Sequence, residues 1–369
     1  MSATLSTTAT LPTELIDEIL RSDVLSNHDL ARCCLTSRQF LPAARHSLYD
    51  HVRVIFYVAR RSGGQGARHV SLSRASNQLF ETLKASPALG RRVKSISFLK
   101  SVVRFMSRAK KILLTGPTVF ISILHVAPNA CRVALDEHWA RVLQYQVDLR
   151  DSRVKEIAVD GLSSSEADKL SIPNQVNRLK LTRMRDPYSR FQLTSQALQA
   201  LDAGHARSAT FFTPQLRILR CLSLSNIDDI SGFTALTHLC LVLENVDPYL
   251  ENKIKLVAPE VLDPSPPLAN LRFLSFETGH LSPGDDAAVD SLLSAVPLGH
   301  QIVLRFPQRV PFDLLAERFG RTLVPARRIQ VSKLAREQDS TKLSQLRRQC
   351  LAVGIEFEWV ASKSVDIFS

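Results

Sequence analysis

The chain repeats one arrangement of hydrophobic and polar residues along most of its length. In this arrangement, apolar-x-x-apolar-x-apolar, most x positions are polar or charged. We call each copy a strand frame, and the copies occupy 93–98, 130–135, 154–159, 176–181, 219–224, 236–241, 271–276, 301–306, 326–331 and 354–359. Alternation with a period of two is typical of a strand that buries one face. Single copies also arise by chance in a chain this hydrophobic, so the prediction of strands depends on their spacing and on the segments between them.

Most frames follow one another at intervals of about 20 to 37 residues, near the spacing of leucine-rich repeats. Helical patterns fill several of the gaps, at 194–201, 286–297, 311–319 and 340–352. The frame at 219–224 runs on to Asn226, an asparagine that such repeats favour, and the other frames lack it. Repeated strand-and-helix units predict a curved array with an extended concave surface. A compact α/β domain with a parallel sheet is the structural alternative.

The first part of the chain predicts three short helices. Pro12 suits the first turn of a helix, and Glu14 lies where the helix dipole favours an acid. An apolar stripe follows at Leu15, Ile16, Ile19 and Leu20. A second pattern runs from Asn27 to Leu35 and a third from Phe40 to Tyr49. So small a unit buries too little core alone, so we expect it to lie against another domain or another chain.

Composition describes a globular chain with a large core. Of its 369 residues, 45% are hydrophobic and 22% are charged, which excludes a disordered polyampholyte. The length predicts two or three domains or one elongated array. Six cysteines occur without any CxxC spacing, which favours reduced thiols in the cytoplasm or nucleus over a disulfide framework. The uncharged stretch 112–131 is interrupted by Gly116 and Pro117, so we predict no transmembrane segment.

The net charge of +12 is unevenly distributed. From Thr82 to Leu135 there is no acidic residue, while ten basic residues accumulate: Lys84, Arg91, Arg92, Lys94, Lys100, Arg104, Arg108, Lys110, Lys111 and Arg132. A face of this kind is either a solvated surface or a contact for nucleic acid, acidic lipid or an acidic protein.

Sequence motifs for catalysis are absent. The chain has no GxxxxGK[ST], HExxH or GxSxG motif, and its glycine cluster at 62–66 is not a GxGxxG. We therefore predict a non-enzymatic protein with no cofactor, no metal site and no catalytic residues.

The N-terminal unit, from Leu11 to about Val54, resembles the F-box. The resemblance depends on the order and spacing of these pieces: Leu11-Pro12, Glu18-Ile19-Leu20, Asp29-Leu30, Leu35 through Phe40, and Leu48-Tyr49. Thr36 and Tyr49 depart from the usual valine and tryptophan. The rest of the chain is similar to the leucine-rich-repeat-like body of fungal F-box proteins.

The resemblance implies a function. F-box proteins are substrate receptors of SCF-type cullin-RING ubiquitin ligases, in which the F-box docks on a Skp-type adaptor and the second domain captures a protein substrate. By this resemblance the residues that face or support the adaptor are Leu11, Pro12, Ile16, Ile19, Leu20, Leu30 and Leu35. How the apolar stripe divides between the internal core and the interface stays open, and so does the substrate.

The resulting prediction is an α+β or α/β chain, with a small three-helix F-box followed by an irregular leucine-rich-repeat-like α/β array. Its predicted segments are a flexible tail (1–10), the F-box (11–54), a connecting loop and helix (55–88) and the substrate-recognition domain (89–369). Two other functions stay open: a protein-interaction scaffold that acts outside the ligase, and a basic protein that binds nucleic acid or membranes.

Overall fold

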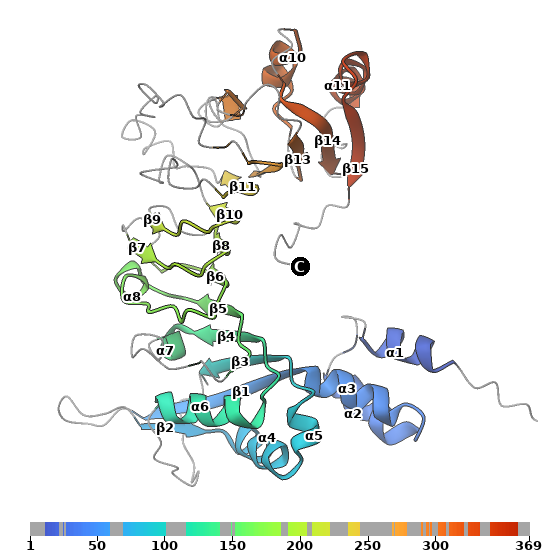
Figure 1. Cartoon of the computed structure of the whole chain (residues 1–369). Coiled ribbons are helices and arrows are strands. Elements are labelled where there is room, and N and C mark those ends of the chain that lie inside the picture. Colours follow the sequence, from blue (N-terminus) through green and yellow to red (C-terminus); the bar gives the residue numbers. More distant parts are fainter. Residues whose placement is uncertain are drawn as a thin grey trace, which may run out of the picture. The chain divides into compact units, whose positions relative to one another are not determined.

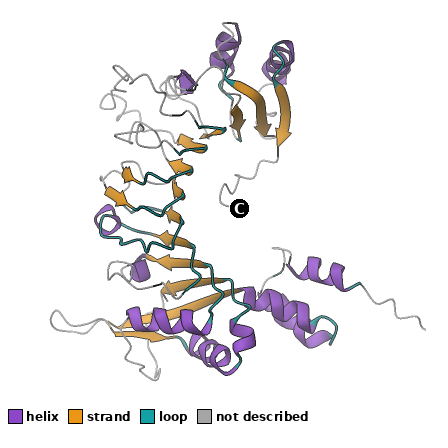
Figure 2. Cartoon of the chain, viewed as in Figure 1, coloured by secondary structure: helices purple, strands orange, loops and turns teal. Residues whose placement is uncertain are grey.

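A computed structural model of the chain (Figure 1) describes these residues: 12–21, 25, 27–59, 69–100, 116–140, 149, 152–185, 191–204, 209–221, 235–243, 268, 270–278, 289–290, 293–294, 296, 302–307, 310–320, 324–332 and 340–360. Helices and strands are mixed along the chain (Figure 2). The chain divides into two compact units. Unit 1 comprises residues 1–142 and 147–154, and unit 2 comprises residues 143–146 and 155–369.

Unit 1 begins with three helices and continues as a small sheet with further helices. Its elements are α1 (Thr13–Arg21), α2 (Asn27–Thr36), α3 (Leu41–Asp50), β1 (His51–Ala59), β2 (His69–Leu72), α4 (Arg74–Ala85), α5 (Pro87–Gly90), β3 (Ser95–Lys100), α6 (Gly116–Val126), β4 (Arg132–Asp136) and α7 (Glu137–Ala140). Its strands follow the order β4-β3-β1-β2. β1 pairs in parallel with β3 and antiparallel with β2, and β3 pairs in parallel with β4.

The three predicted N-terminal helices are confirmed, and local chemistry explains where they begin and end. The N–H of Ile16 donates to the carbonyl of Pro12 at 3.2 Å, which closes the first turn of α1. At the end of α2 the Thr36 hydroxyl donates back to the carbonyls of Arg32 and Cys33, so the side chain satisfies groups that the helix end leaves open. Phe40 then precedes α3 and packs against the buried cluster of the three helices.

Aromatic side chains form the core of unit 1 beneath its sheet. Phe56 of β1 and Phe98 of β3 both contact the ring of Trp139 from α7, at centroid distances of 4.8 and 4.9 Å. Phe120 of α6 packs on Phe98 at 5.0 Å. All four side chains are fully buried, and edge-to-face and tilted contacts of this kind add to the free energy of burying the rings. The helix α6, which lies within the uncharged stretch, therefore contributes to this core.

Unit 2 is built on a large parallel sheet. Its elements are β5 (Glu156–Asp160), α8 (Ser164–Ala167), β6 (Arg178–Thr182), β7 (Phe191–Thr194), β8 (Ala200–Ala203), β9 (Ala209–Phe212), β10 (Ile218–Cys221), β11 (His238–Leu243), β12 (Phe273–Thr278), β13 (Ile302–Phe306), α10 (Phe312–Gly320), β14 (Ala326–Ser332), α11 (Ser340–Ala352) and β15 (Glu356–Val360). The strands of the large sheet follow chain order, β5-β6-β8-β10-β11-β12-β13-β14-β15, while β7 and β9 pair separately.

One face of this sheet carries a continuous row of buried apolar residues. In each frame the fourth and sixth residues lie on this face, and the register places the fourth residues of neighbouring strands side by side. The row is Ile157, Leu179, Leu201, Leu219, Leu239, Leu274, Leu304 and Ile329, all fully buried. Burying one such side chain is worth about 2 kcal/mol relative to leaving it exposed. The predicted alternation therefore places one row of side chains from consecutive strands in the core.

A recurrent hydrogen-bond pattern precedes the strands of both units. The first residue of a frame closes a turn onto the residue three positions earlier, as in Val93 N–H to Gly90 O and Val176 N–H to Pro173 O. The carbonyl of the second residue then accepts two N–H groups from the next strand segment. Lys155 O, for example, accepts from the N–H groups of Asn177 and Arg178. These bonds set the register before the strand itself begins.

The frame predicted at 219–224 is wrong in register. The strand β10 is Ile218–Cys221, so its frame is Leu216-x-x-Leu219-x-Cys221, three residues earlier than predicted. The turn from Leu216 N–H to Thr213 O and the two bonds accepted by Arg217 O belong to this register. Asn226, which supported the predicted register, lies outside the described residues. All the other predicted frames coincide with strands.

The helix predicted at 194–201 is also wrong. Residues 200–203 form β8, which lies between β6 and β10 and fills the long gap between two predicted frames. Leu198, Leu201 and Ala203 follow the frame and are fully buried, but the same leucines are three apart and also suit a helix. Helices are confirmed at 312–320 and 340–352, and the described residues within 286–297 include helical positions at 289–290 and 293–294.

Two strands of unit 1 were not predicted. β1 follows α3 directly and extends past Val54, and β2 lies within the segment expected to be a connecting loop.

Within the parts of the chain that the structure describes, no helix is both long and apolar enough to cross a membrane.

Candidate functional site

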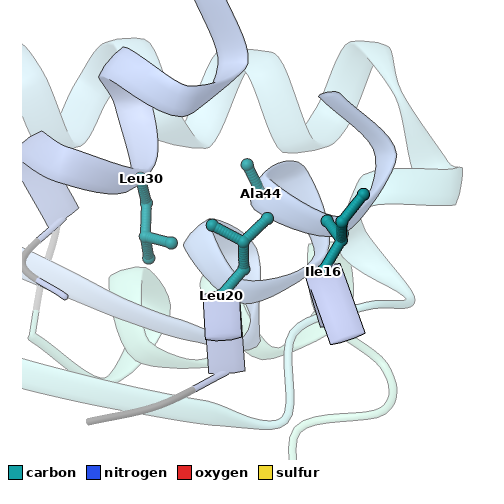
Figure 3. Close-up of a cluster of buried hydrophobic side chains, with 5 residues drawn as sticks. Ile16, Leu20, Leu30 and Ala44 are labelled. Atoms are coloured by element: carbon teal, nitrogen blue, oxygen red, sulfur yellow. The ribbon is translucent and has the colours of Figure 1, made fainter. Parts of the chain in front are cut away.

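The residues predicted to serve an adaptor divide between the buried core of the three-helix unit and its surface. Ile16, Leu20 and Leu30 point into the space between the helices, together with Ala44 (Figure 3). Their exposed fractions are 1%, 4% and 5%. These residues therefore hold α1, α2 and α3 together, and any contribution they make to a docking surface is indirect.

Three of the other predicted residues are exposed. Ile19 is 52% exposed and Leu35 is 88% exposed, and Pro12 is exposed as well, while Leu11 lies outside the described residues. Leu15, which the prediction left out of the set, is 46% exposed. The three-helix unit thus presents large apolar side chains to solvent.

Periodicity alone did not distinguish the inward from the outward residues of α1. Leu15 lies four residues before Ile19, and Ile16 lies four residues before Leu20. Each of these two pairs therefore forms a stripe on one face of the helix. The two stripes are adjacent, and only the packing of α1 against the other helices decides which of them is buried. This is why Leu15 was missed.

The face of the unit 2 sheet opposite the apolar row is polar. The register places these residues side by side along consecutive strands: Ala158, Lys180, Asp202, Arg220, Cys240, Ser275, Arg305, Gln330 and Glu358. They occupy the fifth position of the frame, between the two buried apolar positions. Asp202, Cys240 and Ser275 on this row are buried, whereas Glu358 at its end is exposed.

Arg220 lies at the centre of this polar face and binds two carboxylates. Its Nη1 lies 3.0 Å from Asp202 Oδ1 on β8, and its Nη2 lies 2.8 Å from Glu277 Oε2 on β12. Lys180 Nζ reaches the other oxygen of Asp202 at 3.7 Å, and the thiol of Cys240 donates to Glu277 Oε1 at 3.2 Å. We call these five residues the Arg220 network.

The electrostatics of the network follow from its burial. Asp202 is 3% exposed and Glu277 is 8% exposed, so each depends on the guanidinium for compensation. Burial alone would lower the pKa of Arg220, but the carboxylates of Asp202 and Glu277 raise it above its ordinary value. A Cβ at Gly204 would lie 2.6 Å from Arg220 Nη1, so glycine at this position leaves room for the guanidinium.

The thiol of Cys240 in this network is not activated as a nucleophile. Burial, followed by the charge of Glu277 and its hydrogen bond, raises the pKa of Cys240 well above its ordinary value, so the sulfur stays a thiol and is a poor nucleophile. His238, on the neighbouring row of β11, has its pKa lowered by burial and by Arg272. No group of His, Cys, Asp and Glu able to hold a metal ion occurs among the residues that the structure describes.

The acid-free stretch contributes exposed positive charge to unit 1. Arg91, Arg92 and Arg132 are exposed, whereas Lys94 pairs with Asp50 at 3.0 Å. His51 of β1 lies between the hydroxyls of Ser95 and Ser97, with its ring nitrogens at 2.9 and 3.2 Å from them. The basic residues between 101 and 115 lie outside the described part of the chain.

Comparisons of the chain with known protein families, with curated proteins and with solved structures find no match. The functional argument therefore depends on the chain's own residues and their placement.

Proposed function

We propose that this chain is the substrate-receptor subunit of an SCF-type cullin-RING ubiquitin ligase, located in the cytoplasm or nucleus. The observation that carries the proposal is the coincidence of the F-box-like pieces with a three-helix unit that leaves Leu15, Ile19 and Leu35 exposed. Large apolar side chains on the surface of a small helical unit are typical of a surface that another protein covers. We assign this surface to a Skp-type adaptor.

In this proposal unit 2 is a leucine-rich-repeat-like domain that recruits a protein substrate. The parallel sheet supports the assignment, because strands stacked in chain order display their fifth frame positions along one long face. Such a receptor performs no chemistry. It raises the effective concentration of the substrate near the ubiquitin-conjugating machinery.

The adaptor interface is tested by co-expression of the full chain with a Skp-type adaptor and measurement of the dissociation constant. Ile19→Asp and Leu35→Asp each place a charge in the proposed interface, so we expect each to weaken binding more than about tenfold. Leu11→Ala with Pro12→Ala tests the start of the same segment. The matched control is Leu351→Asp in unit 2, because Leu351 is also a highly exposed leucine, at 66%.

Stability measurements separate the interface from the fold. Ile19 and Leu35 are exposed, so their variants should unfold at nearly the same denaturant concentration as the wild type. Leu20→Ala should instead lower the free energy of unfolding by about 2 to 5 kcal/mol, because Leu20 is buried. Adaptor binding that is unchanged in both aspartate variants would overturn the assignment. Adaptor binding without co-purification of a cullin would favour a scaffold outside the ligase.

The exposed charge of unit 1 favours a second candidate, binding to nucleic acid or acidic membranes. Arg53, Arg91, Arg92 and Arg132 are exposed, and no ion pair to a carboxylate joins any of them within the described residues. Binding to nucleic acid through such groups weakens steeply as salt increases. A salt titration with duplex DNA and single-stranded RNA tests this candidate, and absent or salt-insensitive binding eliminates it.

A further inference from the structure

The outermost strand of the unit 2 sheet, β15, has one edge that the described chain leaves open. Its inner edge pairs in parallel with β14, from Arg328 opposite Glu356 to Ser332 opposite Val360. β15 ends the sheet (Figure 1), and none of the described strands pairs with its outer edge. A strand edge of this kind presents N–H and C=O groups that are able to bond to a further strand.

The apolar face of β15 is incompletely covered. Ile329 and Val331 of β14 are both 0% exposed, whereas their register partners Phe357 and Trp359 are half-buried and 39% exposed. The two rings contact each other at 5.4 Å in a T-shaped arrangement. The apolar row that is buried in the strands before it therefore ends in two aromatic side chains that a further strand would cover.

The opposite face of β15 is acidic. Arg328 Nη2 lies 2.6 Å from Glu356 Oε2, and its Nη1 lies 3.4 Å from Glu358 Oε2. The side chains of these glutamates nevertheless stay 65% and 46% exposed. A carboxylate accepts several hydrogen bonds, so β14 uses only part of their capacity.

The rest of the sheet indicates which charge belongs next to these glutamates. On the same polar face Asp202 lies between Lys180 and Arg220, so an acidic residue is bounded on both sides by basic ones. Opposite charges directly across neighbouring strands stabilise a sheet, and like charges destabilise it. Among the described residues, Glu356 and Glu358 have a basic neighbour only on the β14 side, and a basic residue on the outer side would complete the pattern.

We infer that the outer edge of β15 binds an extended segment of another protein in which basic and apolar residues alternate. Main-chain hydrogen bonds to β15 supply affinity, apolar side chains cover Phe357 and Trp359, and basic side chains reach Glu356 and Glu358. A second copy of this chain is a poor occupant, because β15 against β15 would bring acidic faces together. The inference depends on unit 2 alone and stands whether or not the three-helix unit binds an adaptor.

The test uses the full chain and a labelled synthetic peptide that alternates lysine and valine. Binding is measured by fluorescence anisotropy against two comparison peptides, one that alternates glutamate and valine and one with the lysines and valines in separate blocks. We expect saturable binding of the alternating lysine peptide, at least about tenfold tighter than either comparison peptide. Equal binding of all three peptides would overturn the inference.

Substitutions place the peptide on β15. The double substitution Glu356→Gln with Glu358→Gln should weaken binding of the lysine peptide at least about fivefold. Glu356→Lys with Glu358→Lys should reverse the preference toward the glutamate peptide. Asp313→Asn is the control for lost negative charge, since Asp313 is exposed on α10 and should have no effect. Unchanged binding in the double glutamine variant would overturn the assignment to this edge.

Tryptophan fluorescence gives a readout without a label. The chain has two tryptophans, and Trp139 is 2% exposed, so a blue shift of the emission on peptide binding reports on Trp359. A Trp359→Phe variant should lose this shift and keep binding. Self-association of the wild type in sedimentation experiments, strengthened by the double glutamine substitution, would show that a second copy occupies the edge and would overturn the inference.

Discussion

Arg220 and Glu277 form an ion pair across an intervening strand. Arg220 lies on β10 and Glu277 on β12, with β11 between them, and Arg220 Nη2 is 2.8 Å from Glu277 Oε2. The guanidinium spans the strand that carries Cys240, whose thiol donates to the same glutamate. One side chain therefore ties together the polar faces of β8, β10 and β12.

We expect Arg220→Met to destabilise unit 2 strongly. The substitution keeps most of the side-chain volume but leaves Asp202 and Glu277 without the cation that compensates their burial, and removing one partner of a buried ion pair costs about 3 kcal/mol or more. Urea denaturation measures this free energy of unfolding.

Arg328→Met is the matched control. Arg328 also pairs with a glutamate of the next strand, but the side chains of Arg328 and Glu356 are 41% and 65% exposed. Exposed ion pairs of this kind contribute less than about 1 kcal/mol. If Arg220→Met and Arg328→Met lower the free energy of unfolding equally, the role given to burial is contradicted.

A glycine contact in unit 1 supplies a second prediction. A Cβ at Gly90 would lie 2.0 Å from the backbone oxygen of Val126, so alanine there would push α5 away from the end of α6. We expect Gly90→Ala to cost about 3 kcal/mol. Gly320→Ala, at the end of α10 where no atom lies within 4 Å, should instead be neutral or stabilising by up to about 1 kcal/mol. The two variants are compared by their midpoints of thermal unfolding. Similar midpoints would contradict the close approach of residue 90 to the backbone oxygen of Val126.

The cysteines should fall into two reactivity classes. Burial raises the pKa of Cys221 to about 12 and that of Cys350 to about 11, and burial and Glu277 raise that of Cys240. At about pH 8 these three should remain thiols and resist iodoacetamide in the folded protein, because the thiolate is the reactive form. Cys33, Cys34 and Cys131 are half-buried and should react first. Mass spectrometry before and after unfolding in guanidinium chloride measures each site, and alkylation of folded Cys240 as fast as Cys131 would contradict the prediction.

Stability should fall on the acid side of neutrality because of two histidines. Burial, together with Arg53 and Arg132, lowers the pKa of His51, and burial with Arg272 lowers that of His238. In the unfolded chain both histidines take up a proton near their ordinary pKa of 6.5, whereas in the folded chain they do so only at lower pH. The unfolded state therefore binds more protons, and the free energy of unfolding decreases as pH falls below about 6.5. The double variant His51→Gln with His238→Gln should show a smaller decrease in the free energy of unfolding between about pH 7 and pH 5, measured by urea denaturation. If the double variant loses as much free energy of unfolding over this range as the wild type does, other groups cause the decrease.

Much of the fold follows from local pattern. The alternation in Val154, Ile157 and Val159 predicts a strand with one buried face, and all three residues are fully buried beside or within β5. The helices around Ile16 and Leu30 also follow from short-range spacing, because capping and amphipathic periodicity act within a few residues.

What the sequence left open depends on contacts between distant residues. The stretch LRILRCLSL contains two overlapping frames, and hydrophobicity does not choose between them. The choice is made by hydrogen bonds to neighbouring strands, in which Arg217 donates to Gln199 and its own carbonyl accepts from Thr237 and His238. The Arg220 network is hidden for the same reason, because its charges come together only once β8, β10 and β12 are aligned. The exposure of Leu15 likewise depends on how α1 packs.

The order of strands in the unit 2 sheet has a consequence for synthesis. From β6 to β15, each strand of the large sheet pairs with the strand of that sheet that precedes it in the chain. A nascent chain leaving the ribosome can therefore add one strand at a time to an edge that already exists, without waiting for a distant segment to be translated. The order in which these strands are translated is therefore the same as their spatial order in the sheet, from β5 to β15.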